Sequence, residues 1–147
     1  MSDSKEDDID SDNINWSITN PSTPSQYFHL LRRQMIRNYR KPLIVATPKI
    51  LLRHPSCVST ITEFANNSYF KPVLSDPKVT NDSQIKRVVF CSGKHFYTLD
   101  KEREEKGIKD IAFVRLEELC PFPAKQLSEQ LSKYKSAKGL SVLVLLN

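Results

Sequence analysis

The sequence predicts an α/β protein in which strands and helices alternate. Short apolar runs recur at 43–46, 85–91 and 111–116, and such runs are typical of strands that are covered on both faces. Between them lie longer segments with apolar residues at helical spacing, separated by Pro, Gly and Asn. In the second half the order is β-α-β-α-β. A single sheet built in that order has parallel strands.

The composition is that of a globular domain. The chain has 147 residues, of which 39% are hydrophobic and 27% charged, and no apolar run approaches the roughly 20 residues of a membrane span. We therefore expect no membrane partner. The three cysteines are odd in number and lack CxxC spacing, which argues against a disulfide framework and a zinc site and predicts reduced thiols: Cys57, Cys91 and Cys120.

Residues 1–15 are predicted to form a disordered acidic tail. The first twelve residues hold six acids and one base, Lys5, with almost no apolar residue to offset the entropy of ordering. A mitochondrial transit peptide is instead rich in arginine and poor in acids, so we expect none in this chain. The net charge of the whole chain is +5, so the residues after this tail are strongly basic.

A helix is predicted over 24–38. Thr23 is a capping residue, Pro24 suits the first helical position, and Gln26 completes a capping box. The apolar residues at helical spacing predict one buried face, formed by Tyr27, Phe28, Leu31 and Met35. The arginines predict a second face turned to water, formed by Arg33, Arg37 and Arg40.

The next segments predict shorter elements. The apolar run 43–46 is predicted to be a central strand. One or two helical turns follow Thr47-Pro48 and end at Pro55, and a short helix is predicted around 58–65. Residues 69–74 are predicted to be extended, and Pro72 makes them an edge strand or a connector.

The polar stretch 75–84 contains Pro77 and has no periodicity, so it predicts a linker or domain boundary. Beyond it the pattern becomes regular. Gly93 predicts a tight turn and Gly107 the end of a helix. The predicted strands are 85–91, 111–116 and 140–146, and the predicted helices are 94–106 and 121–134.

Few residues suggest chemistry. None of the histidines His29, His54 and His95 has a metal-ligand spacing, and surface or supporting roles are favoured for them. Ser92-Gly93-Lys94 could hold an anion at a helix N-terminus, but a simple turn is the favoured interpretation. Glu117 and Glu118 are adjacent at a strand end, point in different directions and cannot share a proton. One of them could be structural, and we expect neither to be a general acid.

The densest basic cluster lies on the first helix and just after it, and it raises the possibility of nucleic-acid binding. Against that, the aromatic residues of this helix lie on the opposite side and do not interleave with the bases. We therefore expect this face of the helix to be solvated or to contact another subunit, and we do not expect it to bind nucleic acid. The cluster comprises Arg32, Arg33, Arg37, Arg40 and Lys41.

Several runs together resemble the 2-oxoglutarate dehydrogenase E1 family, which depends on thiamine diphosphate. The resemblance covers about residues 16–138, and residues 37–40, 94–97 and 118–121 look closer to the branch that acts on 2-oxoadipate in lysine breakdown. The runs that carry it are PSTPSQYFHLLRRQ at 21–34, RKPLIV at 40–45, TPK at 47–49, LLRHP at 51–55, CSGK at 91–94 and EELCPFP at 117–123.

The resemblance implies both a domain division and a function. Residues 16–75 would be the end of a transketolase-like pyrimidine-binding domain, 76–84 a linker, and 85–147 a truncated parallel β-α-β-α-β transketolase C-terminal-like domain. The family enzyme decarboxylates a 2-oxo acid and passes the acyl group to a lipoyl-bearing E2. A second E1 protomer and E2 are the implied partners, and the mitochondrial matrix is the implied location. Without a transit peptide, a complete product of this sequence would be cytosolic.

The departures from the family limit what the chain can do. Thiamine diphosphate enzymes hold magnesium and diphosphate through a Gly-Asp-Gly motif followed by Asn-Asn, because Mg²⁺ needs hard oxygen ligands. None of the three glycines here adjoins an aspartate, so Asn66-Asn67 does not complete such a motif. The run 140–147 also departs from the family pattern. We therefore expect no catalytic, cofactor-binding or metal-binding residue in this chain, although the intact enzyme uses thiamine diphosphate and Mg²⁺.

The resulting interpretation is an inactive C-terminal fragment of an E1 component. The alternative is a non-catalytic interaction protein that binds full-length E1, or another component of the complex, through its exposed sheet and the Arg33/Arg37 face. Whether the sequence is a complete product, a splice form or an incomplete gene prediction is open at this point.

Overall fold

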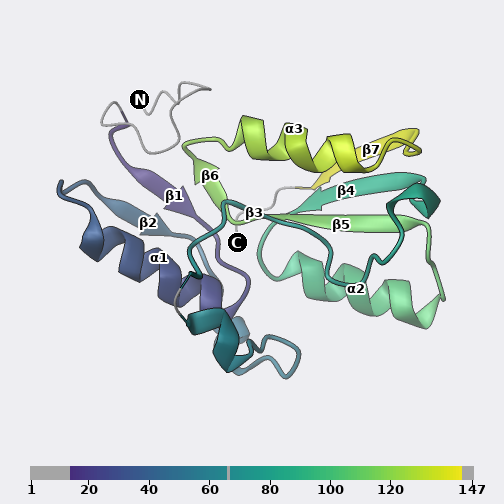
Figure 1. The fold of residues 1–147 in the computed structure, drawn as a ribbon. Helices are drawn as coiled ribbons and strands as arrows, with labels where there is room; N and C mark the ends of the chain where they lie inside the picture. The colour runs from purple at the N-terminus through teal and green to yellow at the C-terminus, as the bar shows by residue number, and fades with distance from the viewer. Residues whose placement is uncertain (1–13, 66, 144–147) are drawn as a thin grey trace.

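The computed structural model describes residues 14–65 and 67–143, and these form two sheets with helices packed against them (Figure 1). One sheet has three strands in the order β2-β1-β6, and the other has four in the order β3-β5-β4-β7. The predicted α/β class is confirmed. The acidic segment predicted to be disordered lies almost entirely outside the described residues.

The first sheet contains a helix-strand unit and one strand from much later in the chain. β1 (Ser17–Thr19) pairs in parallel with β2 (Leu43–Val45), and α1 (Pro24–Ile36) connects them. β6 (Glu118–Cys120) pairs with the other side of β1 in antiparallel orientation. The predicted central position of residues 43–46 is therefore wrong. β2 is an edge strand with a partly exposed side-chain pattern, because β1, which lacks an apolar run, takes the central place.

The predicted faces of α1 are also wrong. The cap is confirmed, since the Thr23 hydroxyl accepts a hydrogen bond from Gln26 N. The helix nevertheless buries Ser25, Gln26, His29 and Leu30, and it exposes the apolar residues Tyr27 (38%), Phe28 (45%), Leu31 (45%) and Met35 (77%).

The inward polar residues of α1 satisfy backbone groups of the segment that covers the helix. Gln26 Nε2 donates to Lys71 O over 2.6 Å and Gln26 Oε1 accepts from Lys71 N over 3.1 Å, so this side chain does not complete the predicted capping box. His29 Nε2 lies 2.7 Å from Glu63 O. Buried backbone groups need such partners, and this requirement outweighs the hydrophobic preference of the helix.

The second sheet contains the predicted parallel core. β4 (Arg87–Cys91) pairs in parallel with β5 (Ile111–Leu116) on one side and with β7 (Gly139–Leu143) on the other. The antiparallel edge strand β3 (Val73–Leu74) makes the sheet mixed, which corrects the prediction of an all-parallel sheet. The extended edge predicted at 69–74 is confirmed for residues 73 and 74, which form this strand.

Two helices cover opposite faces of this sheet (Figure 1). α3 (Ala124–Lys133) contributes Leu127 to a core that includes Val88, Phe90 and Val114. α2 (His95–Glu105) contributes Phe96 and Tyr97 to a second core, with Leu51, Cys91 and Phe113. Even-numbered residues of β4 and β5 face α3 and odd-numbered ones face α2, as the alternation of side chains along a strand requires.

The remaining described elements are short 3₁₀ helices. They are η1 (Lys49–Arg53), η2 (Ile61–Phe64) and η3 (Asp82–Gln84). The helix predicted over 58–65 is thus a single turn, which begins at a capping box formed by Thr60 and Glu63. The predicted turn and helix end are confirmed by the positive φ of Gly93 (57°) and Gly107 (61°). A side chain at Gly93 would also collide with Asn20, whose Oδ1 lies 2.6 Å from the position of the missing Cβ.

The two sheets exchange strands. β3 precedes the predicted linker but pairs with β5, and β6 follows β5 directly but pairs with β1. The segment 76–84 has defined structure, because it contains the buried Asp76 and the 3₁₀ helix η3. The domain division with a linker at 76–84 stays a prediction, and the pairing shows that each sheet depends on residues from both sides of it.

Candidate functional site

A buried polar cluster lies where the chain passes from β5 into β6. Ser22, in the loop before α1, donates to Glu117 from its backbone N over 2.8 Å and from its hydroxyl over 2.5 Å. Arg115 Nη1 donates to the same hydroxyl over 3.2 Å, and its guanidinium lies 4.2 Å from the centre of the Phe96 ring. Tyr97 OH donates to Ser22 O over 2.6 Å. Ser22 and Glu117 have no exposed surface, so the cluster joins both halves of the chain without contact with water.

Burial raises the pKa of the Glu117 carboxyl above its usual 4.5, although Arg115 and the two hydrogen bonds from Ser22 act in the opposite direction. A buried acid with a raised pKa is a frequent feature of catalytic sites. Here, however, both carboxylate oxygens are already bound by Ser22, and the group is closed to substrate. The arrangement favours a structural role for Glu117.

The raised pKa predicts a specific dependence of stability on pH. The folded chain holds a proton on Glu117 at pH values where the unfolded chain has lost it, so this group stabilises the fold fully below pH 4.5 and loses that contribution as pH rises through the folded pKa. We expect Glu117→Gln to gain stability relative to the wild type across this window and to show a constant difference above it. Urea unfolding from pH 4 to pH 8, in about one-unit steps, measures this difference.

Glu102→Gln provides the matched control. Glu102 lies on the surface of α2, and its hydrogen bond from Lys106 lowers the pKa of its carboxyl, so its contribution is lost as pH falls. The control difference must therefore change in the opposite direction only as pH falls below about 4.5, and it must stay flat from pH 5 to pH 8. A Glu117→Gln difference that stays flat from pH 4 to pH 8 would contradict the assignment.

The neighbouring Glu118 anchors α1 to the first sheet. Its side chain is fully buried, and Arg33 donates to its two carboxylate oxygens over 2.5 and 3.1 Å. The Arg33 guanidinium also stacks 4.4 Å from the centre of the Phe70 ring. The water-facing position predicted for Arg33 is thus wrong. The prediction that the two adjacent acids point in different directions is confirmed, since Glu117 binds the loop before α1 and Glu118 binds α1 itself.

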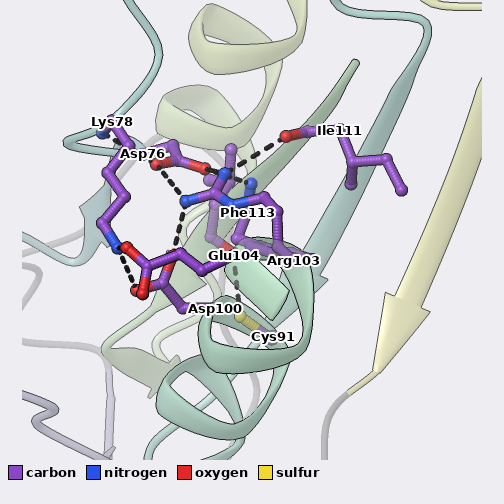
Figure 2. A network of polar contacts seen from close by, with 9 residues as sticks. Asp76, Lys78, Cys91, Asp100, Arg103, Glu104, Ile111 and Phe113 are labelled. Carbon is purple, nitrogen blue, oxygen red and sulfur yellow. Dashed lines mark hydrogen bonds and ion pairs between the residues drawn. The ribbon is translucent and has the colours of Figure 1, made fainter. Parts of the chain in front are cut away.

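A second buried network ties the predicted linker to α2 (Figure 2). Arg103 Nη1 donates to Asp76 Oδ2 over 2.5 Å and to Ile111 O over 3.2 Å, and Arg103 Nη2 donates to Asp100 over 2.6 Å. Asp76 also accepts from Phe113 N over 2.8 Å and from Lys78 N over 2.9 Å. Burial acts to raise the pKa of Asp100, but the bonds from Lys78 and Arg103 outweigh it and hold that pKa below its usual value.

Part of the predicted basic cluster lines a groove of about 650 Å³ beside the C-terminal half of α1. Arg32, Arg33 and Arg37 contribute to its wall, together with Tyr39, Tyr69 and Phe70. Arg33 is committed to Glu118, Arg32 donates to Ser68 O over 3.2 Å, and Arg40 donates to Arg37 O over 3.1 Å. Much of the cluster therefore binds the protein itself.

The remaining predicted candidates have structural surroundings. His29 bonds the backbone of η2, and His54 accepts from Ser56 N over 3.2 Å while its ring packs 4.9 Å from that of Tyr97. His95 is the first residue of α2. All three cysteines are free, and burial raises the pKa of the Cys91 thiol to about 12, so this thiol stays protonated at neutral pH.

The described residues do not fit the magnesium and diphosphate of a thiamine enzyme. In residues 14–65 and 67–143, no group of three or more His, Cys, Asp and Glu side chains is placed to hold a metal ion. The acids of the two buried clusters are occupied by Arg103, Ser22 and Arg33.

Sequence reasoning missed the partners of the buried acids. The sequence does not predict Ser22, Asp76 and Arg115 as members of buried polar clusters, because nothing in the order of residues shows which remote residues they contact. A signal did exist for Asp76 and Arg103. An acid beside a proline in a polar stretch and an arginine that shares a helix side with apolar residues are both candidates for a buried pair.

Comparison with known protein families identifies the family of this chain. The family described as 2-oxoglutarate dehydrogenase C-terminal matches residues 58–142, more than half of the chain. The chain belongs to this family. Ahead of that match, the family of transketolase pyrimidine-binding domains matches residues 12–55, so the predicted resemblance to both parts is confirmed.

Several relatives of this chain are named as E1 components of 2-oxo acid dehydrogenases. The 2-oxoadipate dehydrogenase complex component E1 of Mus musculus is 56% identical over 95% of this chain, and a probable homologue of it in Dictyostelium discoideum is 54% identical over 90%. The 2-oxoglutarate dehydrogenase E1 component of Brucella anthropi is 47% identical over 84%. The chain spans only 13% to 15% of the length of these three relatives.

No helix among the described residues is long and apolar enough to cross a bilayer.

Proposed function

We propose that this chain is the C-terminal part of the E1 component of a 2-oxo acid dehydrogenase complex, with 2-oxoadipate or 2-oxoglutarate as the substrate of the intact enzyme. The observation that supports this most strongly is the 56% identity to a 2-oxoadipate dehydrogenase E1 over 95% of the chain. Thiamine diphosphate, magnesium, a second E1 protomer, the lipoyl-bearing E2 and the mitochondrial matrix belong to this proposal as properties of the whole enzyme.

The contribution of this part of E1 is architectural. The buried acids Asp76, Glu117 and Glu118 are each bound to residues distant in the chain: Asp76 ties the segment after β3 to α2, Glu118 ties β6 to α1, and Glu117 binds the loop before α1. The division into a pyrimidine-binding part at 16–75, a linker at 76–84 and a C-terminal-like part at 85–147 is retained within this proposal. In this proposal the chain stabilises the fold of this part of E1, and the catalytic residues lie in the rest of the enzyme.

A direct test is an activity assay of the 147-residue chain. We expect no release of CO₂ from 2-oxoadipate or 2-oxoglutarate in the presence of thiamine diphosphate and Mg²⁺, because the buried acids Asp76, Glu117 and Glu118 are bound in structural contacts. A full-length E1 assayed in parallel is the positive control. Turnover above the buffer background by the isolated chain would refute the architectural role.

The outward apolar face of α1 favours one second candidate, an interaction protein that binds full-length E1. Tyr27, Phe28, Leu31 and Met35 form a partly exposed stripe at helical spacing, in which the Phe28 ring packs 5.5 Å from that of Phe64. Co-purification of the chain with a relative's E1 at micromolar concentration supports this candidate if Leu31→Lys abolishes the association. Val58→Lys, at a position 70% exposed and outside α1, is the matched control. An association that survives Leu31→Lys counts against this surface.

A further inference from the structure

A small polar pocket lies between the start of α1, the segment 67–71 and β5. Its volume is about 240 Å³, and its wall includes Thr23, Ser25, His29, Lys71 and Arg115. Pockets that take drug-sized ligands have volumes of about 300 Å³ or more, so this pocket has room only for a small group. All five residues lie well inside the described part of the chain.

Arg115 contributes a buried cation to this wall. The residue is only 7% exposed. Its Nη1 donates to Ser22 Oγ, whereas its Nε has no hydrogen-bond partner among the described residues. No carboxylate in residues 14–65 and 67–143 forms an ion pair with its guanidinium. Because a buried charge without a counter-charge is costly, an anion in the pocket would stabilise this arginine.

Glu117 is a weak counter-charge for Arg115. Its two carboxylate oxygens are bound by the backbone N and the hydroxyl of Ser22. Burial raises the pKa of Glu117, and this favours the neutral form of its carboxyl. The positive charge of Arg115 is therefore only partly compensated within its own cluster.

The rest of the wall carries one further cation and one acid. Lys71 is exposed, and its Nζ lies 5.9 Å from the centre of the Tyr69 ring without an ion pair in the described part of the chain. The acid is Glu63, whose Oε1 accepts from Thr60 N over 2.9 Å and whose Oε2 accepts from the Ser25 hydroxyl over 2.9 Å. The wall thus has two cations against one acid, and that acid is already bound.

We propose that this pocket binds a small oxyanion, the phosphate or carboxylate group of a small molecule, with Arg115 as its buried partner and Lys71 at the entrance. Guanidinium and ammonium groups bind such oxygens through charge-assisted hydrogen bonds, which are stronger than those between neutral groups. The site goes beyond the E1 role and does not depend on it, because it is built from side chains that this chain itself supplies.

A titration of the ¹⁵N-labelled 147-residue chain followed by nuclear magnetic resonance tests the proposal. Inorganic phosphate and acetate are added separately up to about 20 mM, and sodium chloride of equal ionic strength is the reference. We expect a saturable shift of the Arg115 Nε–H signal, with a dissociation constant of about 1 mM or lower for at least one oxyanion. Saturation by phosphate alone assigns a phosphate ligand, and saturation by acetate alone assigns a carboxylate.

Variants at the entrance of the pocket test the location. Lys71→Met is expected to raise the dissociation constant about two- to fivefold, because it removes an exposed charge, and Lys71→Arg is expected to keep it within about twofold of the wild type. Neither change removes the bonds between the backbone of Lys71 and Gln26. Lys125→Met is the matched control, since Lys125 is an exposed lysine on α3, which covers the opposite face of the sheet from α2.

The proposal is overturned if neither oxyanion shifts the Arg115 signal more than chloride does. It is also overturned if Lys71→Met leaves the dissociation constant unchanged, or if Lys125→Met raises it by the same factor. Should Lys71→Met fail to fold, the Arg115 signal of the wild type still decides whether the pocket binds an oxyanion.

Discussion

Replacing Arg103 by methionine is expected to lower the free energy of unfolding by about 3 to 5 kcal/mol. The Asp76 side chain has no exposed surface, and Arg103 is its cationic partner at 2.5 Å. Methionine fills much of the same volume but leaves the carboxylate buried without a counter-charge, and removal of one partner of a buried pair is far more costly than its loss at a surface. Urea unfolding followed by far-UV circular dichroism measures the change.

Two further variants separate this effect from the loss of a helix residue. Lys106→Met, at the end of the same helix, removes an exposed lysine paired with Glu102 and should change stability by less than about 1 kcal/mol. The double variant Asp76→Asn/Arg103→Met should recover part of the loss, because no buried charge remains unpaired. A double variant whose loss equals the sum of the two single losses would show that the pair does not act as a unit.

Replacing Arg33 by methionine is expected to cost on the order of 3 kcal/mol. The change leaves the fully buried Glu118 without the arginine that binds both of its oxygens, and it removes the stacking on Phe70. Because Glu118 lies on β6 and Arg33 on α1, the loss should loosen the first sheet before the second. Trp16, the single tryptophan, adjoins this sheet through its backbone contact with Cys120, so its fluorescence reports the loosening.

Arg32→Met is the neighbouring control. Arg32 is exposed and reaches only the backbone of Ser68, so we expect a change of less than about 0.5 kcal/mol. Equal effects at positions 32 and 33 would mean that Glu118 is stabilised by something other than Arg33. A fluorescence transition of Arg33→Met that coincides with the far-UV transition would contradict the earlier loosening of the first sheet.

The parallel core of the second sheet could be predicted because its signals are local. The strand 111–116 appears with the predicted bounds, and the strand predicted at 85–91 begins two residues later. The strand predicted at 140–146 begins at Gly139, and its predicted end lies outside the described residues. β-branched apolar runs mark such strands, while glycines with a positive φ mark the turn at Gly93 and the helix end at Gly107. These signals depend on neighbouring residues, which the sequence displays directly.

The short strands escaped prediction because their pairing is not local. β1 and β6 have three residues each and exist through pairing across about a hundred residues of chain. The predicted orientation of α1 is wrong for a related reason. Its polar residues turn inward to bond the backbone around Glu63 and Lys71, and these partners lie more than thirty residues further along the chain. Periodicity shows that a helix has two faces, but it does not show what each face will meet.

By itself the sequence determined the α/β class, the Thr23 cap, the positions of the main strands and helices, and the resemblance to E1. Propensities, caps and turn residues act over a few residues, so they can be inferred from the order of residues alone. Only the tertiary structure decided which charged residues are buried and which strands change sheets. Asp76, Glu117 and Glu118 are stable inside the protein because folding brings Arg103, Ser22 and Arg33 within hydrogen-bonding distance of them. Their desolvation has to be offset by partners that are remote in the chain.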